Sequence, residues 1–410
     1  MSKRVNKGKR WAVCDKVLAL RILFHSPQTL NVLRTIFCVP SQTCLLLFLS
    51  CIFSDLQEGF STRLFSLLKL RADAMNPHDR NFSLVMNKMS LKQHLEYDRN
   101  SDRVYGMKNG KPLNQALVIM VRGLANKWKQ PIAYFYNNST VSTADLAFLL
   151  SETISKVQET GLHIRCVVCD QGSTNIAALC LLGFSKNLTY FPNPSNDKNI
   201  HVFFDPPHLV KSIRNNLRRH NIDFNGEIVS WQHIQSLYNL DKINSVRLVP
   251  KLTDRHLDPG PLLSMKVKLA TQVFSYQVAS ALYCYSNTNL LPLSVLPTAR
   301  FVERMDTLFD ILNSYKLYAD KPGRCALTLK GASISQLEEL KHWIEKWNFC
   351  NVRSQASTSC HWGLSVTINS VLTFSRELFS EGFQFVCTSR FNQDCIENFF
   401  PHYSKQRWLE

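Results

Sequence analysis

Three positions in this 410-residue chain have the residue types and surroundings of a divalent-metal site. Asp170 follows the apolar run of residues 163–169, Asn87 follows the apolar run of residues 82–86, and Glu397 stands in a helical pattern further along. Hydrolysis or transfer at a phosphodiester by two metal ions requires carboxylates that concentrate negative charge around them. Asp170 and Glu397 supply that charge, whereas Asn87 offers one neutral oxygen. The pattern predicts a metal-dependent nuclease site in which one ligand has changed.

Asp394 is a further acid beside Glu397. Because the two residues are three positions apart, a helix places both side chains on one face. An acid in the first turn of a helix is also favourable for the helix itself, and this capping role is compatible with a functional one. The spacing by itself is therefore weak evidence for a site.

Strand and helix signals alternate from residue 82 to residue 217. Apolar runs predict five strands, at residues 82–86, 116–121, 131–136, 163–169 and 201–204. Helical patterns predict helices at residues 142–157, 176–182 and 209–217. Three strands, helix, strand, helix, strand, helix is the order of an α/β RNase H-like mixed sheet. Because ligands bind at the carboxyl edge of such a sheet, we expect Asn87, Asp170 and Glu397 to converge there.

Composition changes along the chain divide it into five segments. Residues 11–75 carry short helical patterns broken at Ser26-Pro27, which suit either a helix-turn-helix and dimerisation-like module or a plain helical bundle. A mostly helical insertion follows the first strands and helices. We expect a basic, nuclear-targeting tail at 1–10, the helical segment at 11–75, the RNase H-like core at 76–217, the insertion at 218–388, and the truncated return of the core at 389–410.

The charge balance favours a polyanionic partner. The chain has 48 Lys and Arg against 31 Asp and Glu, a net charge of +17, and such a surplus promotes nucleic-acid binding through phosphate contacts. Four basic residues on consecutive turns after the fifth predicted strand are candidate DNA contacts: Lys211, Arg214, Arg218 and Arg219. The alternative is a basic protein without such a partner.

Cysteines and apolar runs argue against other classes of protein. The 13 cysteines are odd in number and scattered, as expected for reduced thiols. Cys166 and Cys169 form a C-x-x-C within a strand, where their side chains point to opposite faces, so we interpret them as core residues and not zinc ligands. The apolar run of residues 44–53 is about half the length that spans a bilayer, and we expect no membrane partner.

Four motifs of the chain resemble those of the P-element-type DNA transposases, including their THAP-domain relatives. They occur in the family's order, at residues 85–97, 169–175, 204–216 and 392–400, and the third contains Asp205-Pro206-Pro207-His208. Residues 252–253 and 265–270 add a fifth motif inside the insertion. The resemblance covers roughly residues 11–400, although we expect neither the THAP zinc finger nor the family's C-terminal segment.

The resemblance implies an RNase H-like core that is split by a GTP-binding insertion, with Mg²⁺ and GTP as cofactors and a homo-oligomer acting on DNA in the nucleus. Asp170 corresponds to the second catalytic Asp and Glu397 to the catalytic Glu, while Asp394 matches an acid near the bound nucleotide. Lys266 and Lys268 lie where the insertion holds its nucleotide, but the two are not distinguished. Their alternative role is that of solvated lysines on an amphipathic helix.

Departures from the family pattern predict impaired catalysis. Asn87-Lys88 replaces the family's Asp-Glu pair, so the first catalytic carboxylate is an amide. Pro401 should also end the helix of Glu397 early, since proline in a helix interior costs about 3 kcal/mol. We therefore expect a transposase-derived protein with little activity. The alternatives are a non-catalytic, domesticated nucleic-acid-binding or dimerisation protein, and a nuclease that uses Asp205, which its motif otherwise marks as structural.

Overall fold

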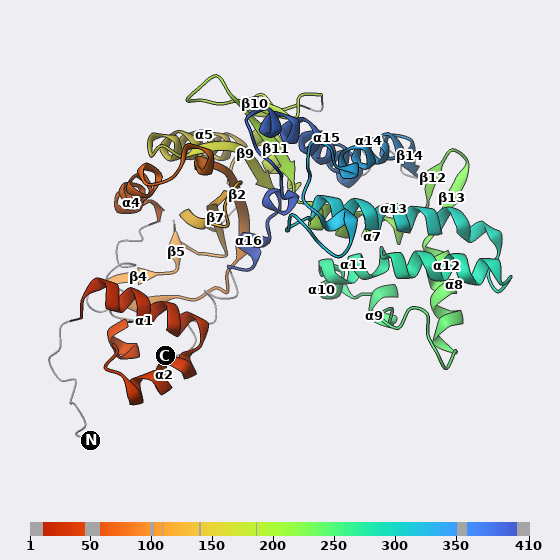
Figure 1. Ribbon diagram of the computed structural model, residues 1–410, viewed down its shortest axis with the longest axis horizontal. Coiled ribbons are helices and arrows are strands. Elements are labelled where there is room, and N and C mark those ends of the chain that lie inside the picture. The colour runs from red at the N-terminus through yellow and green to blue at the C-terminus, as the bar shows by residue number, and fades with distance from the viewer. Residues whose placement is uncertain are drawn as a thin grey trace. The chain divides into compact units, whose positions relative to one another are not determined.

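The computed structural model describes residues 11–45, 58–98, 102–108, 110–138, 141–185, 187–350 and 359–399. Contacts between residues divide the chain into two compact units, Met1–Leu64 and Phe65–Glu410 (Figure 1). The basic tail at 1–10, most of the apolar run at 44–53, Pro401 and the last residues lie outside the described part. Within that part, no helix combines the length and the apolar character that crossing a membrane requires.

The first unit contains two helices that meet at one residue. Helix α1 (Val13–His25) and helix α2 (Pro27–Ile36) are separated only by Ser26, whose hydroxyl accepts a hydrogen bond from Thr29 N–H at 3.2 Å. Proline suits the first position of α2 because that position needs no N–H donor. The break expected at Ser26-Pro27 is confirmed. A small core holds the helices together and consists of Ala19, Leu20, Leu23, Leu30 and Leu45.

The second unit is built on a mixed sheet. Its strands, in spatial order, are β8 (Lys129–Asn137), β7 (Gln115–Gly123), β2 (Asn81–Ser90), β9 (His163–Cys169), β11 (Asn199–Phe204) and β10 (Tyr190–Pro192). β7 pairs antiparallel with β2 and β8, whereas β2, β9 and β11 are parallel neighbours. The five expected strands and the RNase H-like α/β class are confirmed. The short strand β10 was not expected from its three residues.

Strand β2 is longer than the sequence indicated. Asn87 lies inside the strand and pairs with Val118 of β7, and pairing continues to Ser90 opposite Gln115. The expectation that the strand ends before Asn87 was therefore wrong. The antiparallel partner extends the ladder past the apolar run, because backbone pairing does not require apolar side chains.

Helices cover the sheet, and six of the seven residues of β9 are buried. The covering helices include α5 (Thr143–Glu159), α6 (Ser173–Leu181), α7 (Pro206–Leu217) and α15 (Ser359–Ser380). Ser142 caps α5 as expected, accepting from Asp145 N–H at 3.1 Å. The sequence placed α15 in the insertion, but its contacts with β11 and α7 place it on the core sheet. The return to the core therefore begins before residue 389.

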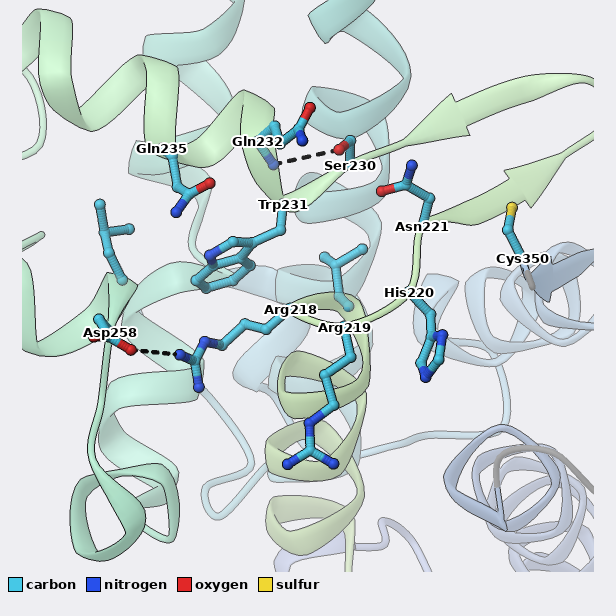
Figure 2. A pocket seen from close by; sticks show the side chains of 12 residues that line it. Arg218, Arg219, His220, Asn221, Ser230, Trp231, Gln232, Gln235, Asp258 and Cys350 are labelled. Atoms are coloured by element: carbon cyan, nitrogen blue, oxygen red, sulfur yellow. Dashed lines mark hydrogen bonds and ion pairs between the residues drawn. The ribbon is translucent and has the colours of Figure 1, made fainter. Parts of the chain in front are cut away.

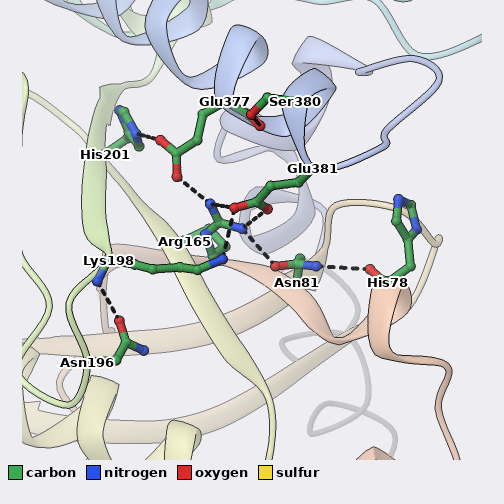
Figure 3. Close-up of polar contacts among 9 residues, drawn as sticks. All are labelled: His78, Asn81, Arg165, Asn196, Lys198, His201, Glu377, Ser380 and Glu381. Carbon is green, nitrogen blue, oxygen red and sulfur yellow. Dashed lines mark hydrogen bonds and ion pairs between the residues drawn. The ribbon is translucent and has the colours of Figure 1, made fainter.

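An ionic network fastens α15 to the sheet (Figure 3). Arg165 of β9 is 1% exposed and forms ion pairs with Glu377 and Glu381 of α15, the second at 2.5 Å. His201 of β11 contacts Glu377 at 2.7 Å, and Lys198 contacts Glu381 at 2.8 Å. Each of these five charged groups thus has an oppositely charged partner within the network.

The insertion is mostly helical, as expected. Its longer helices are α8 (Trp231–Lys242), α11 (Val267–Val273), α12 (Tyr276–Asn287), α13 (Leu296–Leu312) and α14 (Ala332–Glu345). Shorter elements are α9 (Asp254–Leu257), α10 (Pro261–Ser264) and a sheet of β13 (Glu227–Val229), β12 (Ile222–Phe224) and β14 (Trp347–Phe349). α12 and α13 lie side by side in Figure 1 and pack together.

The remaining elements flank the core. Helix α4 (Thr62–Asp73) precedes β2, and two small hairpins pair β3 (Glu96–Asp98) with β4 (Arg103–Tyr105) and β5 (Met107–Lys108) with β6 (Lys111–Pro112). Helix α16 (Asp394–Glu397) has four residues and carries two of the candidate acids. Its position relative to the sheet decides whether these acids can belong to one site.

Candidate active site at the carboxyl edge of the sheet

Asn87 lies in β2, and Asp170 directly follows the neighbouring parallel strand β9. Val85 of β2 pairs with Val168 of β9, and Asn87 and Asp170 each lie two residues beyond that pair. The register therefore brings the backbone at Asn87 and the backbone at Asp170 to the same end of the β2–β9 pair.

Gln393 anchors helix α16 to this same edge. Its side-chain Nε2 donates to Met86 O of β2 at 2.6 Å, and its backbone N–H donates to Asp205 Oδ1 at 2.7 Å. Met86 directly precedes Asn87, and Asp205 directly follows β11. These two bonds join the residue before α16 to β2 and to the turn after β11, and α16 itself contacts β2 and β7.

Asp205 is a structural acid in this arrangement. It is 2% exposed, and its second oxygen, Oδ2, accepts from His208 N–H at 2.9 Å at the start of α7. Burial raises the pKa of Asp205 to about 6. Both oxygens accept hydrogen bonds from backbone donors, and the side chain is almost fully buried, so little of this carboxylate is open to a metal ion. These contacts favour a structural role for Asp205 over the alternative in which it replaces the acid that is absent at position 87.

His208 holds the carboxylate of Glu397. Its Nε2 lies 2.9 Å from Glu397 Oε1, and both side chains are partly exposed. Burial opposes the charged imidazole, but the hydrogen bond to Glu397 and the charge of Asp205 outweigh it and raise the pKa of His208. The same hydrogen bond lowers the pKa of Glu397. Glu397 is therefore oriented by α7 as well as by its own helix.

Only one of the two carboxylate oxygens of Asp170 accepts hydrogen bonds from the described residues. Its Oδ1 accepts from Gly172 N–H at 2.9 Å and from Asn175 Nδ2 at 2.6 Å. Oδ2 has no hydrogen-bond partner among the described residues. The side-chain oxygen of Asn87 accepts from Lys88 N–H at 2.8 Å. Asp170 thus keeps one oxygen available at the edge where the strands end.

The basic residues of α7 differ in their surroundings. Lys211 lies one turn after His208, and burial lowers its pKa, although the charges of Glu397, Asp205 and Asp170 oppose this effect. Arg214 is fully buried, and its Nη2 donates to Ser264 O at 2.9 Å. Arg214 cannot contact DNA in this structure, and that expectation was wrong because helical spacing turns this residue inward, toward Ser264 of α10.

Arg218 and Arg219 border a polar pocket of about 580 Å³ at the end of α7 (Figure 2). Arg218 forms an ion pair with Asp258 at 3.0 Å, and its guanidinium lies 5.9 Å from the centre of the Trp231 ring. Arg219 is exposed. These two arginines remain accessible to a ligand, unlike Arg214.

Asp394 lies where the insertion meets the core. Its Oδ2 accepts from Asn392 Nδ2 at 2.9 Å, and the same Nδ2 donates to Asn313 Oδ1 at 2.8 Å, just after α13. Burial and the charge of Glu397 raise the pKa of Asp394. Lys266 and Lys268, at the start of α11, are exposed and have no described contact with Asp394.

The oxygen donors at the sheet edge fit Mg²⁺ in kind but are low in charge. Mg²⁺ prefers carboxylate and carbonyl oxygens, and Asp170, Glu397 and Asn87 offer them. In the described ranges, no three His, Cys, Asp or Glu side chains are grouped so that they could hold a metal ion. Asn87 supplies the neutral oxygen at the position beside Asp170.

Several residues of the site were not found from the sequence. Asn175 orients Asp170, Asn392 orients Asp394, and His208 orients Glu397. Asn175 and Asn392 stand in the same motif as the acid that each supports, so their signal was proximity along the chain, whereas His208 and Glu397 belong to two motifs that are far apart in the sequence. Nothing in the sequence indicated that Gln393 would join β2 to β11.

Comparisons with known proteins agree with this architecture. Residues 56–183 match the family model "TNP-like, RNase H N-terminal domain", and residues 207–324 match "TNP-like, GTP-binding insertion domain". The Transposable element P transposase of Drosophila melanogaster is 29% identical over 403 residues, which cover 96% of this chain and 51% of that protein. The DNA transposase THAP9 of Homo sapiens is 29% identical over 326 residues, which cover 74% of this chain and 35% of that protein. The chain thus spans about half or less of the length of these relatives.

A solved structure extends the similarity to three dimensions. The Drosophila P element transposase strand transfer complex contains a chain that superposes with a TM-score of 0.80 at 26% identity. The match covers 97% of this chain and 88% of that one. The similarity therefore includes the core, the insertion and the way in which the insertion interrupts the core.

Proposed function

Since the chain belongs to the P-element-type DNA transposase family, we propose that it is a transposase-derived protein that binds DNA and has an impaired catalytic site. Its ancestral reaction would be cleavage and strand transfer of DNA. The RNase H-like core, the GTP-binding insertion and the likeness to the strand transfer complex support the relationship. The observation that supports the impairment is Asn87, an amide in place of a carboxylate on β2, the strand that pairs with β9.

Residue roles follow from the geometry of the carboxyl edge. Asp170 Oδ2 and the free oxygen of Glu397 would hold Mg²⁺, which would supply charge stabilisation at the phosphodiester. His208 orients Glu397 and occupies its Oε1. Asn87 adds an oxygen without a charge, so the site attracts divalent ions less strongly than one with three carboxylates.

GTP is the second expected cofactor. The match of residues 207–324 to the GTP-binding insertion supports it, and Asp394, Lys266 and Lys268 are its candidate contacts. Titration of the protein with GTP, followed by the fluorescence of its tryptophans, tests whether the insertion binds nucleotide.

DNA is the proposed partner, in a homo-oligomer located in the nucleus. The net charge of +17 and the accessible Arg218 and Arg219 support DNA binding. Binding should be largely independent of sequence and should weaken steeply between low and physiological salt, because phosphate contacts release counterions. An affinity that does not change with salt would contradict this mode of binding.

Cleavage of labelled DNA with Mg²⁺ tests the catalytic state. We expect no cleavage above background by the unaltered protein and little restoration by Asn87→Asp alone. Asp170→Ala and its combination with Asn87→Asp are the controls for contaminating nucleases. Robust nicking by the unaltered protein that Asp170→Ala abolishes would show that the site is complete despite Asn87.

A non-catalytic DNA-binding or dimerisation protein is the second candidate. Asn87 favours it, because this function needs the fold and not the metal. Salt-dependent DNA binding without cleavage, even by the Asn87→Asp protein, is the outcome that separates it from a repairable nuclease.

A further inference from the structure

The pocket at the end of α7 has the size and the lining of a ligand site. Its volume of about 580 Å³ falls in the range of small-molecule pockets, about 300–1,000 Å³. It lies where the last turn of α7 meets the start of α8, away from the sheet edge that holds Asp170 and Glu397. Asp394, Lys266 and Lys268 do not line it.

One wall of the pocket is basic and aromatic. Arg218 extends along the Trp231 ring toward Asp258 in Figure 2, and Arg219 follows on the same turn. Asp258 is 96% exposed at its side chain, and an ion pair with an exposed partner contributes little to stability. Arg218 can therefore exchange Asp258 for an anion at little cost, and two arginines against one carboxylate leave positive charge in the pocket.

The opposite wall is neutral and polar. Gln232 and Gln235 lie one turn apart on α8, and both are exposed. Their side-chain amides, like the guanidinium of Arg219, have no hydrogen-bond partner in the described part of the chain. Amides both donate and accept hydrogen bonds, so this wall suits a polar group that carries both donors and acceptors.

We propose that this pocket binds one nucleotide unit, with its phosphate on Arg218 and Arg219 and its polar body against the α8 amides. Guanidinium groups bind phosphate through paired hydrogen bonds, and the edges of nucleobases carry the donors and acceptors that amides recognise. The unit could come from a DNA strand or from a free nucleotide. This inference rests on the proposed function and adds to it a second contact, remote from the sheet edge.

Two variants of the full chain test the pocket. Arg219→Ala removes a phosphate contact, and Gln235→Glu introduces a negative charge with almost no change in shape. Both residues are exposed, so both variants should fold, as thermal unfolding would verify. The matched controls are Lys330→Ala and Gln336→Glu, which make the same changes of charge at exposed positions outside the pocket.

Each protein is titrated with a labelled DNA duplex, a labelled single strand and GTP. We expect both pocket variants to weaken binding of one ligand class at least tenfold, while both controls stay within twofold of the unaltered protein. Loss confined to DNA identifies a strand as the source of the nucleotide unit, and loss confined to GTP identifies the free nucleotide.

Failure of the pocket and failure of the proposed function give different results. If the unaltered protein and both pocket variants bind DNA and GTP equally well, the pocket inference is overturned and the proposed function stands. If the unaltered protein binds neither DNA nor GTP, both are overturned.

Discussion

Strands β9 and β11 carry charged clusters at both of their ends, and the two clusters differ in how completely their groups are paired. Toward the amino ends, Arg165 and His201 meet Glu377 and Glu381 of α15, and Lys198 joins them (Figure 3). This network balances two permanent cations against two carboxylates. It fixes a helix to the sheet and leaves little capacity to bind anything else.

At the carboxyl ends, the acids keep part of their binding capacity. Asp170 uses one oxygen within the fold, and Glu397 is held by His208 through one oxygen. Asp205, in contrast, is buried, and both of its oxygens accept hydrogen bonds from backbone donors. Acid oxygens without a hydrogen-bond partner in the fold, and not the mere presence of acids, therefore distinguish a candidate ligand site from a structural ionic cluster.

Arg165→Met should have the largest effect on stability. Removing one partner of a buried ionic network leaves uncompensated charge and typically costs about 3–5 kcal/mol. We expect a loss of this size in the free energy of unfolding, measured with urea. Arg376→Met is the matched control, because Arg376 pairs with Glu338 on the surface and should cost less than about 1 kcal/mol. Equal losses in the two variants would contradict the contrast.

Glu377→Gln should destabilise the protein by about 2 kcal/mol at pH 7, since hydrogen bonds to charged groups contribute about 1.5–3 kcal/mol. Burial would raise the pKa of Glu377, but His201 and Arg165 lower it overall. Because the pKa of Glu377 is lower in the folded protein than in the unfolded chain, where it is near 4.5, the ionised side chain stabilises the fold above pH 4.5. This contribution disappears as the pH falls through the pKa of Glu377 in the folded protein. The difference between variant and unaltered protein should therefore shrink below pH 4.5. A constant difference from pH 7 to pH 4 would show that the lost contact is not ionic.

Asn87→Asp should strengthen metal binding about tenfold, which corresponds to about 1.4 kcal/mol. The reason is the added negative charge beside Asp170. Titration with Mn²⁺ as the probe, followed by its electron paramagnetic resonance signal, measures the change. Asn196→Asp, at an exposed turn outside the site, is the control for charge alone. If both variants gain equally, the gain reflects net charge and not the site.

Asp170→Asn should have the smallest effect on stability, within about 1 kcal/mol, because the amide keeps the oxygen that Gly172 and Asn175 contact. Metal binding by the Asn87→Asp protein should nevertheless be lost when Asp170→Asn is added. Urea unfolding and the Mn²⁺ titration measure the two properties separately. A large loss of stability would show that Asp170 is structural, as Arg165 is.

Local patterns predicted much of the core. Apolar runs predicted the five strands in their order along the chain, though not their order in the sheet. The Ser142 cap and the break at Ser26-Pro27 were predicted from short-range signals. Boundaries were harder, because pairing with β7 carries β2 past the end of its apolar run, and α15 shows a helical pattern that does not reveal which domain it covers. Arg214 failed as a DNA contact for the same reason, since spacing alone cannot tell which face of α7 is buried.

The sequence alone determined which chemistry is available to this protein: Asp170 and Glu397 in their motifs, Asn87 in place of an acid, and a strongly basic composition. Such information is local, because residue type and short spacing set charge, strand and helix preference. Only the tertiary structure decided which oxygens remain free, that Gln393 joins β2 to Asp205, that His208 holds Glu397, and that the end of α7 forms a pocket with α8. These contacts connect residues as far as 307 positions apart, and they depend on packing that no short stretch of sequence specifies.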